Sequence, residues 1–135
     1  MILYLDSNAI IYALETPGAA RNAVIEQVVL ACLTPGGLVI TSRLARLECR
    51  VKPLREKNAS LLSRYDSFFV HSDLLLAEVT SEVLESATSL RADHGFRTAD
   101  AIHLATALNA KATVFLTGDA ALARCPGIHV ELVKP

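Results

Sequence analysis

Four acidic residues stand out because the sequence around them is apolar: Asp6, Glu48, Asp100 and Asp119. Asp6 and Asp119 follow short apolar runs, whereas Glu48 and Asp100 lie in segments patterned as buried helix. Carboxylates that cluster repel one another and take up protons unless divalent cations bind them. If the fold gathers these four side chains, the sequence predicts a metal-dependent hydrolase.

Three of these acids also have a simpler structural explanation. An aspartate just before a helix accepts hydrogen bonds from backbone N–H groups, which would make Asp6 and Asp119 helix caps. An acid in the first turn of a helix is stabilised by the helix dipole, which would explain Asp100. The catalytic interpretation requires instead that the acids meet at one edge of a sheet.

Glu48 is harder to explain by local structure. Leu44, four residues earlier, and Val51, three residues later, predict that Glu48 lies on the apolar stripe of its helix. Glutamate is rarely buried without a partner. A salt bridge with a neighbouring arginine is the structural alternative to a role in a site.

Short polar residues flank the acids. Ser7, Asn8 and Thr117 are suited to holding carboxylates in place, although turn formation explains them equally well. Arg97 is a candidate phosphate contact, with a solvent-exposed side chain as the alternative.

Histidines are weaker candidates. His103 follows Asp100 by three residues and would lie on the adjacent helical turn, as a metal ligand or general base would. A lone histidine in so apolar a helix is more typical of a hydrogen-bonded packing residue, and we assign it no catalytic role. The other three, His71, His94 and His129, have no ligand spacing.

Composition indicates one cytoplasmic domain spanning residues 1–135. The chain is 52% hydrophobic, enough for a single core, and no apolar run approaches the roughly 18 residues of a membrane span. Cys32, Cys49 and Cys125 are far apart and odd in number, so we expect buried thiols in a reducing compartment rather than disulfides or zinc ligands.

A basic stretch interrupts an otherwise balanced charge distribution. The formal net charge is −1, yet six cationic residues fall between Arg43 and Lys57. A solvated helix face explains this stretch as well as contact with phosphates or an acidic partner does.

Hydrophobic patterning predicts alternating strands and helices. We expect strands at 2–5, 38–41, 74–79, 112–116 and 128–133. We expect helices at 17–33, from Arg43 with a bend or an end before Pro53, at 59–69, at 81–92, after an N-cap at Thr98, and briefly after Asp119. Strands joined by helical crossovers pair in parallel, so helices should cover both faces of one sheet. Asp6 and Asp119 would then emerge at the same carboxyl edge.

The acids lie in strings that resemble a known family. YLDSN contains Asp6, SRLARLEC contains Glu48, FRTADAIHLATAL contains Asp100 and FLTGD contains Asp119. In order and spacing they resemble the four acidic motifs of the PIN-domain ribonucleases, specifically the VapC toxins of toxin–antitoxin pairs. RTADAIHLATA is the most specific string, and the resemblance covers essentially the whole chain.

The resemblance implies a three-layer α/β/α sandwich with a mainly parallel sheet and endoribonuclease activity on RNA. It also implies Mg²⁺ or Mn²⁺ held by the acidic cluster, a homodimer, and silencing by a VapB-like antitoxin. We expect Asp6 and Asp100 to be the central metal ligands, with Glu48 and Asp119 binding directly or through water. Many relatives carry a second acid after the fourth motif, where this chain has Ala120, Ala121 and Leu122.

Other functions remain open from the residues. A phosphatase of haloacid-dehalogenase type also begins with an aspartate at a strand end, but it requires an acid where this chain has Asn8. A response-regulator receiver requires a lysine at a strand end, whereas Lys111 precedes a strand. A catalytically degenerate PIN module that binds RNA or a protein is the non-enzymatic alternative.

The segment at 59–69 carries more large apolar side chains than one helix face normally needs. These residues are Leu61, Leu62, Tyr65, Phe68 and Phe69. They form either part of the core or a surface for a second subunit or an antitoxin.

Overall fold

A five-stranded parallel sheet forms the centre of the computed structural model, which describes residues 1–16 and 18–133. Its strands are β1 (Ile2–Leu5), β2 (Leu38–Ser42), β3 (Leu74–Ala77), β4 (Val114–Thr117) and β5 (His129–Leu132). They lie in the order β3-β2-β1-β4-β5, and every neighbouring pair is parallel. The predicted parallel sheet is confirmed.

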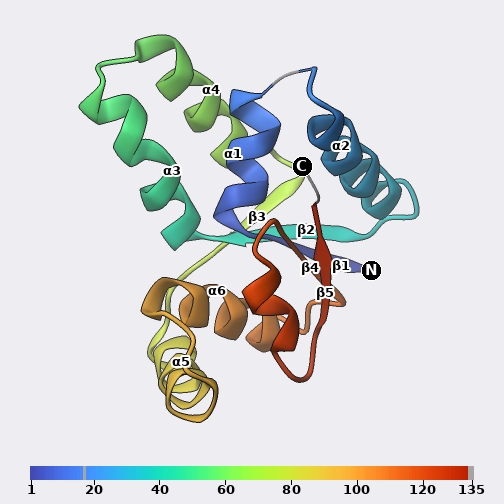
Figure 1. The fold of residues 1–135 in the computed structure, drawn as a ribbon. Coiled ribbons are helices and arrows are strands. Elements are labelled where there is room, and N and C mark those ends of the chain that lie inside the picture. The colour runs from blue at the N-terminus through green and yellow to red at the C-terminus, as the bar shows by residue number, and fades with distance from the viewer. Residues whose placement is uncertain (17, 134–135) are drawn as a thin grey trace.

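Helices cover both faces of this sheet (Figure 1). One layer contains α1 (Ser7–Glu15), α2 (Ala20–Leu33), α3 (Arg43–Arg55) and α4 (Ala59–Phe69). The opposite layer contains α5 (Ser81–His94), α6 (Thr98–Asn109) and the 3₁₀ helix η1 (Ala120–Arg124). The α/β/α sandwich expected from the sequence is therefore the observed architecture.

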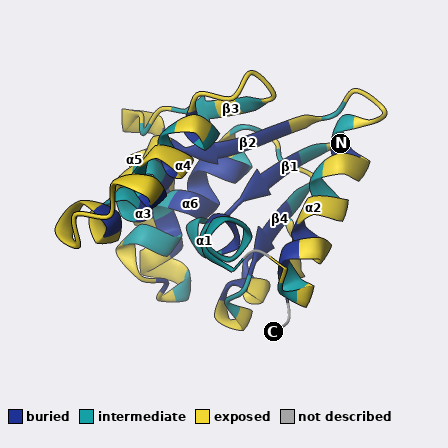
Figure 2. Ribbon diagram, turned by 90° about the horizontal axis from the view of Figure 1, so that it is seen from above, coloured by how far each residue is buried: buried dark blue, intermediate teal, exposed yellow. Residues whose placement is uncertain are grey.

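Alternation along β1 divides the core into two clusters. Leu3 and Leu5 pack against the α1 to α4 layer, whereas Tyr4 points to the α5 and α6 layer and stacks on Phe115. Burial on both faces explains why the strands are short continuous apolar runs (Figure 2).

The sequence did not predict α1. Ser7 begins this helix directly after β1, and the Asp6 carboxylate caps it by accepting the Ser7 N–H at 2.9 Å. Strand and helix share one apolar stretch with no turn residue between them, so hydrophobic pattern alone does not separate them. The expected start of the next helix at Pro17 lies outside the described residues, and α2 begins at Ala20.

Two helix ends differ from what the sequence suggested. The helix from Arg43 does not end before Pro53, which was one of the two outcomes expected there. α3 continues through Pro53 to Arg55, and the buried proline ring lies on the same inward face as Ala45 and Cys49. That burial offsets the backbone hydrogen bond that a proline cannot donate. Arg97, not Thr98, is the N-cap of α6, and the Thr98 hydroxyl instead accepts from Arg91.

The apolar side of α4 belongs mainly to the core. Leu61, Tyr65 and Phe69 are buried, and Leu62 and Phe68 are partly buried. The core alternative therefore holds for the three buried side chains. The three cysteines are buried free thiols, as expected. Within residues 1–16 and 18–133, no helix has the length and apolarity needed to cross a membrane.

Candidate functional site

The expected site lies where the sheet changes its winding direction. From β1 the chain builds β2 and β3 on one side, and later it places β4 and β5 on the other. Loops that leave two such strands in opposite directions open a crevice at the carboxyl edge, where ligands bind in open α/β sheets. Asp6 follows β1 and Asp119 follows β4, so both acids lie at this switch point.

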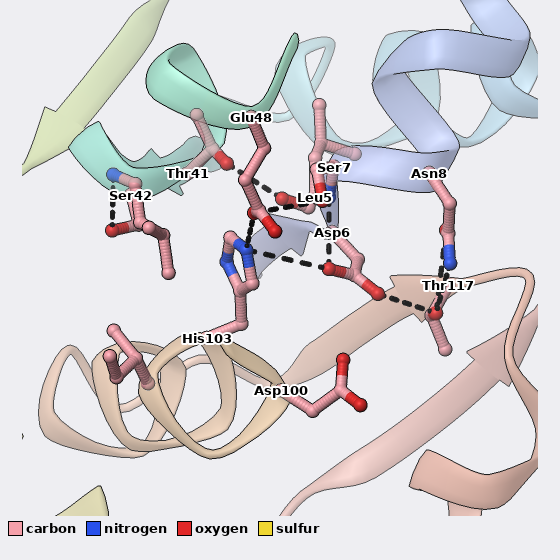
Figure 3. A network of polar contacts seen from close by, with 12 residues as sticks. Leu5, Asp6, Ser7, Asn8, Thr41, Ser42, Glu48, Asp100, His103 and Thr117 are labelled. Carbon is pink, nitrogen blue, oxygen red and sulfur yellow. Dashed lines mark hydrogen bonds and ion pairs between the residues drawn. The ribbon is translucent and has the colours of Figure 1, made fainter. Parts of the chain in front are cut away.

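Asp6 is a buried carboxylate at the centre of the site (Figure 3). Only 3% of the residue is exposed, and its Oδ2 accepts a 2.7 Å hydrogen bond from the Thr117 hydroxyl. Burial raises the pKa of Asp6 above its usual value, and the nearby Asp100 carboxylate adds to that increase. Capping of α1 is thus real, but it does not explain why the chain keeps a charge in so buried a position.

Glu48 approaches from α3 and is held by two side chains. Its Oε1 lies 2.6 Å from Nε2 of His103 and accepts from the Ser7 hydroxyl at 3.1 Å. Burial alone would raise the pKa of Glu48, but the hydrogen bonds from His103 and Ser7 outweigh it, so the pKa is lowered. The partner of Glu48 is therefore His103, not the arginine considered from the sequence.

The expected apolar stripe around Glu48 is also different. Ala45, Cys49 and Pro53 form the buried stripe of α3, whereas Val51 is exposed. Glu48 lies beside that stripe, where it faces the carboxyl edge of the sheet instead of the core.

Asp100 and Asp119 are joined by Arg97. The Arg97 guanidinium lies 3.2 Å from Asp100 Oδ2 and 3.7 Å from Asp119 Oδ2. Its side chain is 82% exposed, so it closes the open side of the cluster. Asp119 Oδ1 also accepts the Ala121 N–H at 3.0 Å, which makes Asp119 the cap of η1 as well as an ion-pair partner.

Asn8 and Thr117 tie the ends of β1 and β4 together. The Asn8 amide donates to the Thr117 hydroxyl oxygen at 3.2 Å and accepts the Gly118 N–H at 2.9 Å. The Asp119 N–H donates to the same hydroxyl oxygen at 3.1 Å. Because Thr117 also donates to Asp6, this network fixes the separation of the two strand-end acids.

The donor set matches a hard divalent cation. All four acids offer carboxylate oxygens, the ligands that Mg²⁺ prefers in proteins. A cation would also offset the Asp100 repulsion, which adds to the effect of burial on the pKa of Asp6. In the described part of the chain, no three His, Cys, Asp or Glu side chains already form a metal-binding group. A cation at this site would compete with Arg97 for Asp100 and Asp119.

His103 is the residue at the site that sequence reasoning assigned no role. It is buried and hydrogen-bonded, as expected, with Nδ1 2.6 Å from the Tyr4 hydroxyl. Its other nitrogen contacts Glu48, and that same Nε2 lies 3.8 Å from Asp6 Oδ1. The only sequence signal was its position one helical turn after Asp100.

The basic stretch on α3 is largely neutralised within the chain. Its ion pairs are Arg43 with Glu78 at 2.8 Å, Arg46 with Asp66 at 3.9 Å, Arg50 with Asp66 at 2.9 Å, and Lys52 with Glu15 at 3.0 Å. The solvated-face explanation therefore accounts for these four cations.

Comparison with known proteins gives one family and several structures similar to this chain. The PIN domain family matches residues 3–128. VapBC2 from Rickettsia felis, solved bound to a DNA fragment from its promoter, is similar with a TM-score of 0.76 and 18% identity over 98% of both chains. The sarcin-ricin loop cleaving toxin VapC20 from Mycobacterium tuberculosis gives 0.74 and 18% identity, covering 98% of this chain and 99% of that chain.

A toxin–antitoxin complex from Klebsiella pneumoniae has a TM-score of 0.70 and 20% identity, over 93% of this chain and 94% of that chain. At such identities these structures establish the shared fold. No curated protein matches the sequence.

Proposed function

Because the chain belongs to the PIN domain family, we propose that it is a metal-dependent endoribonuclease, the VapC-type toxin of a type II toxin–antitoxin pair. The observation that carries this proposal is the buried Asp6 carboxylate at the switch point, with Glu48 and Asp100 near it and Asp119 linked to Asp100 through Arg97. Cleavage of RNA by the purified chain in Mg²⁺ or Mn²⁺, abolished by chelation, tests it.

The proposed roles of the four acids in metal binding follow from their positions. Asp6 and Asp100 are proposed as the central ligands because they come from two different elements of the site and the Asp100 carboxylate adds to the increase that burial causes in the pKa of Asp6. Glu48 and Asp119 complete the donor set. A bound Mg²⁺ or Mn²⁺ would polarise the phosphate and lower the pKa of an attacking water. Arg97, once free of the two aspartates, is placed to contact a phosphate of the RNA.

The geometry favours this function over the alternatives. In a haloacid-dehalogenase-type phosphatase, the residue two positions after the strand-end aspartate would be an acid, whereas Asn8 bridges Thr117 and Gly118 here. A degenerate binding module would have no need to maintain Asp6 in a position where burial raises its pKa. The three free thiols support action in the reducing cytoplasm, where RNA is available.

An antitoxin would find an apolar cavity whose lining includes none of the four acids. The cavity has a volume of about 510 Å³ and lies between α1, α2, α4 and the sheet. Leu14, Leu30 and Phe68 belong to its walls, and the exposed Glu26 and Asp73 are at its rim. An apolar antitoxin segment with flanking cations fits both features, and one of the similar structures is a toxin–antitoxin complex.

Leu30→Arg is expected to weaken antitoxin binding about tenfold, which corresponds to about 1.4 kcal/mol, because it places a charge in an apolar contact. Leu30 is 65% exposed on α2, so the change should leave the unfolding temperature nearly unaltered. Isothermal titration with the cognate VapB-like antitoxin measures the affinity. Leu84→Arg, which alters an exposed leucine on α5, is the matched control. Equal affinities for both variants would place the antitoxin elsewhere.

A homodimer is the remaining part of the proposal. α3 exposes Leu47, Val51 and Leu54, which recur at helical spacing and so line one side of the helix. The cations beside them are paired within the chain, which lowers the repulsion between two copies of this face. Sedimentation velocity of the chain without antitoxin measures its mass, and a monomer at micromolar concentration would contradict this part.

A further inference from the structure

His103 connects the core of the α6 layer to one acid of the site. It is only 1% exposed, and each of its ring nitrogens has a partner at 2.6 Å: the Tyr4 hydroxyl at Nδ1 and Glu48 Oε1 at Nε2. Both contacts join segments distant in the sequence, because Tyr4 lies on β1 and Glu48 on α3. The ring therefore has one orientation in which both hydrogen bonds are made.

The chemistry of the two partners assigns the protons. An ionised Glu48 carboxylate only accepts hydrogen bonds, so Nε2 must carry a proton and donate it. A tyrosine phenol is protonated at neutral pH, and its hydroxyl can donate as well as accept a hydrogen bond. Tyr4 can therefore donate to Nδ1, which completes a directed chain from Tyr4 through His103 to Glu48.

Glu48 needs such a partner more than the other acids do. The Asp6 carboxylate accepts hydrogen bonds from the Ser7 N–H and the Thr117 hydroxyl. The aspartate side chain is also one methylene shorter than that of glutamate, so it has fewer rotamers. Glu48 has a longer side chain that is partly exposed, and Ser7 is its other hydrogen-bond partner. Without His103 the carboxylate would gain several rotamers directed away from the site.

We propose that His103, oriented by Tyr4, is a positioning residue that holds the Glu48 carboxylate toward the metal-binding cluster. The inference rests on the proposed function, since it concerns the same site. It gives the histidine a role through Glu48 and not through direct contact with RNA or metal. Outer-sphere partners of this kind typically change metal affinity or activity about 10-fold to 100-fold when they are replaced.

Two substitutions separate the two ring nitrogens. In His103→Gln the side-chain amide reaches the position of Nε2 and can still donate to Glu48. In His103→Asn the amide reaches only the position of Nδ1, so it keeps the Tyr4 contact and loses Glu48. Titration of the full-length chain with Mn²⁺, followed by electron paramagnetic resonance, is expected to give a dissociation constant about tenfold higher for His103→Asn and within about threefold of wild type for His103→Gln.

A second experiment, in the Glu48→Ala variant, tests whether the effect of His103→Asn on Mn²⁺ binding passes through Glu48. In Glu48→Ala, His103→Asn should weaken Mn²⁺ binding no further, because residues that act as one unit have non-additive effects. If His103→Asn does not fold, Tyr4→Phe is tested in its place, both in the wild-type protein and in Glu48→Ala. Equal weakening by Gln and Asn, tighter binding by Asn, an additive effect in Glu48→Ala, or absence of Mn²⁺ binding by wild type would each overturn the proposal. Selective Mn²⁺ binding without RNA cleavage would support it and reject only the proposed nuclease function.

Discussion

Asp6→Asn and Asp100→Asn are each expected to lower RNA cleavage about a thousandfold or more. A metal ion in a hydrolytic site contributes several kcal/mol to transition-state stabilisation, and each 1.36 kcal/mol corresponds to tenfold in rate. Asparagine keeps the shape of the side chain but removes the anionic ligand. At position 6 it can still cap α1, since an amide oxygen also accepts the Ser7 N–H. The loss should therefore come from the chemistry and not from unfolding.

The measurement is cleavage of structured RNAs by the purified chain in Mg²⁺ and, separately, in Mn²⁺. Asp93→Asn is the matched control, because Asp93 is an exposed acid on α5 outside the cluster. It should cleave at the wild-type rate. Activity that persists in Asp6→Asn or Asp100→Asn, at a level similar to Asp93→Asn, would contradict the proposed mechanism.

Asp6 illustrates what a sequence can reveal about a site. Its place after a buried strand predicts emergence at the carboxyl edge, and the strand order puts it at the switch point. This inference is possible because only a few topologies are allowed for parallel strands that are joined by helical crossovers. The fold could also be predicted from the sequence, because strands that are buried on both faces give short continuous apolar runs.

Side-chain pairing was less accessible because it joins segments distant in the sequence. Arg50 meets Asp66 from α4, and Lys52 meets Glu15 from the unpredicted α1, so the basic stretch looked free when it is largely paired. His103 meets Glu48 across 55 positions. No local periodicity encodes these contacts, since they depend on how α1, α3, α4 and α6 dock on the sheet.

Local conformations near helix ends were also missed where two preferences compete. Pro53 usually ends a helix, yet its ring packs inward on the buried stripe of α3. Thr98 is a good N-cap by type, yet its hydroxyl accepts from Arg91. In both places a tertiary contact overrides a local preference.

The same Asp6→Asn change is expected to stabilise the metal-free protein. Burial raises the pKa of Asp6, so the folded state binds its proton more tightly than the unfolded state does. The stability that Asp6 contributes is therefore present below its unfolded pKa and is lost as the pH rises through the folded pKa. At pH 7 in a chelator, Asp6→Asn should melt roughly 2–4 °C above wild type, and the gap should narrow as the pH falls toward 4. The pKa of Glu48 is lowered, so its contribution to stability changes with pH in the opposite direction. Glu48 is present in both proteins, and this contribution therefore cancels when they are compared.

Adding Mn²⁺ should reverse the order of the two melting temperatures. A ligand that binds only the folded state stabilises it by about 2.7 kcal/mol at 100 times its dissociation constant, and wild type alone keeps the central carboxylate. Differential scanning calorimetry at pH 7, with chelator and then with Mn²⁺, follows both proteins through the change. Wild type that melts above Asp6→Asn in chelator would mean that the burial of Asp6 carries no electrostatic cost. Equal Mn²⁺ stabilisation of both would mean that Asp6 is not a ligand. The reversal, in contrast, would follow from a carboxylate that destabilises the free protein and binds the ion.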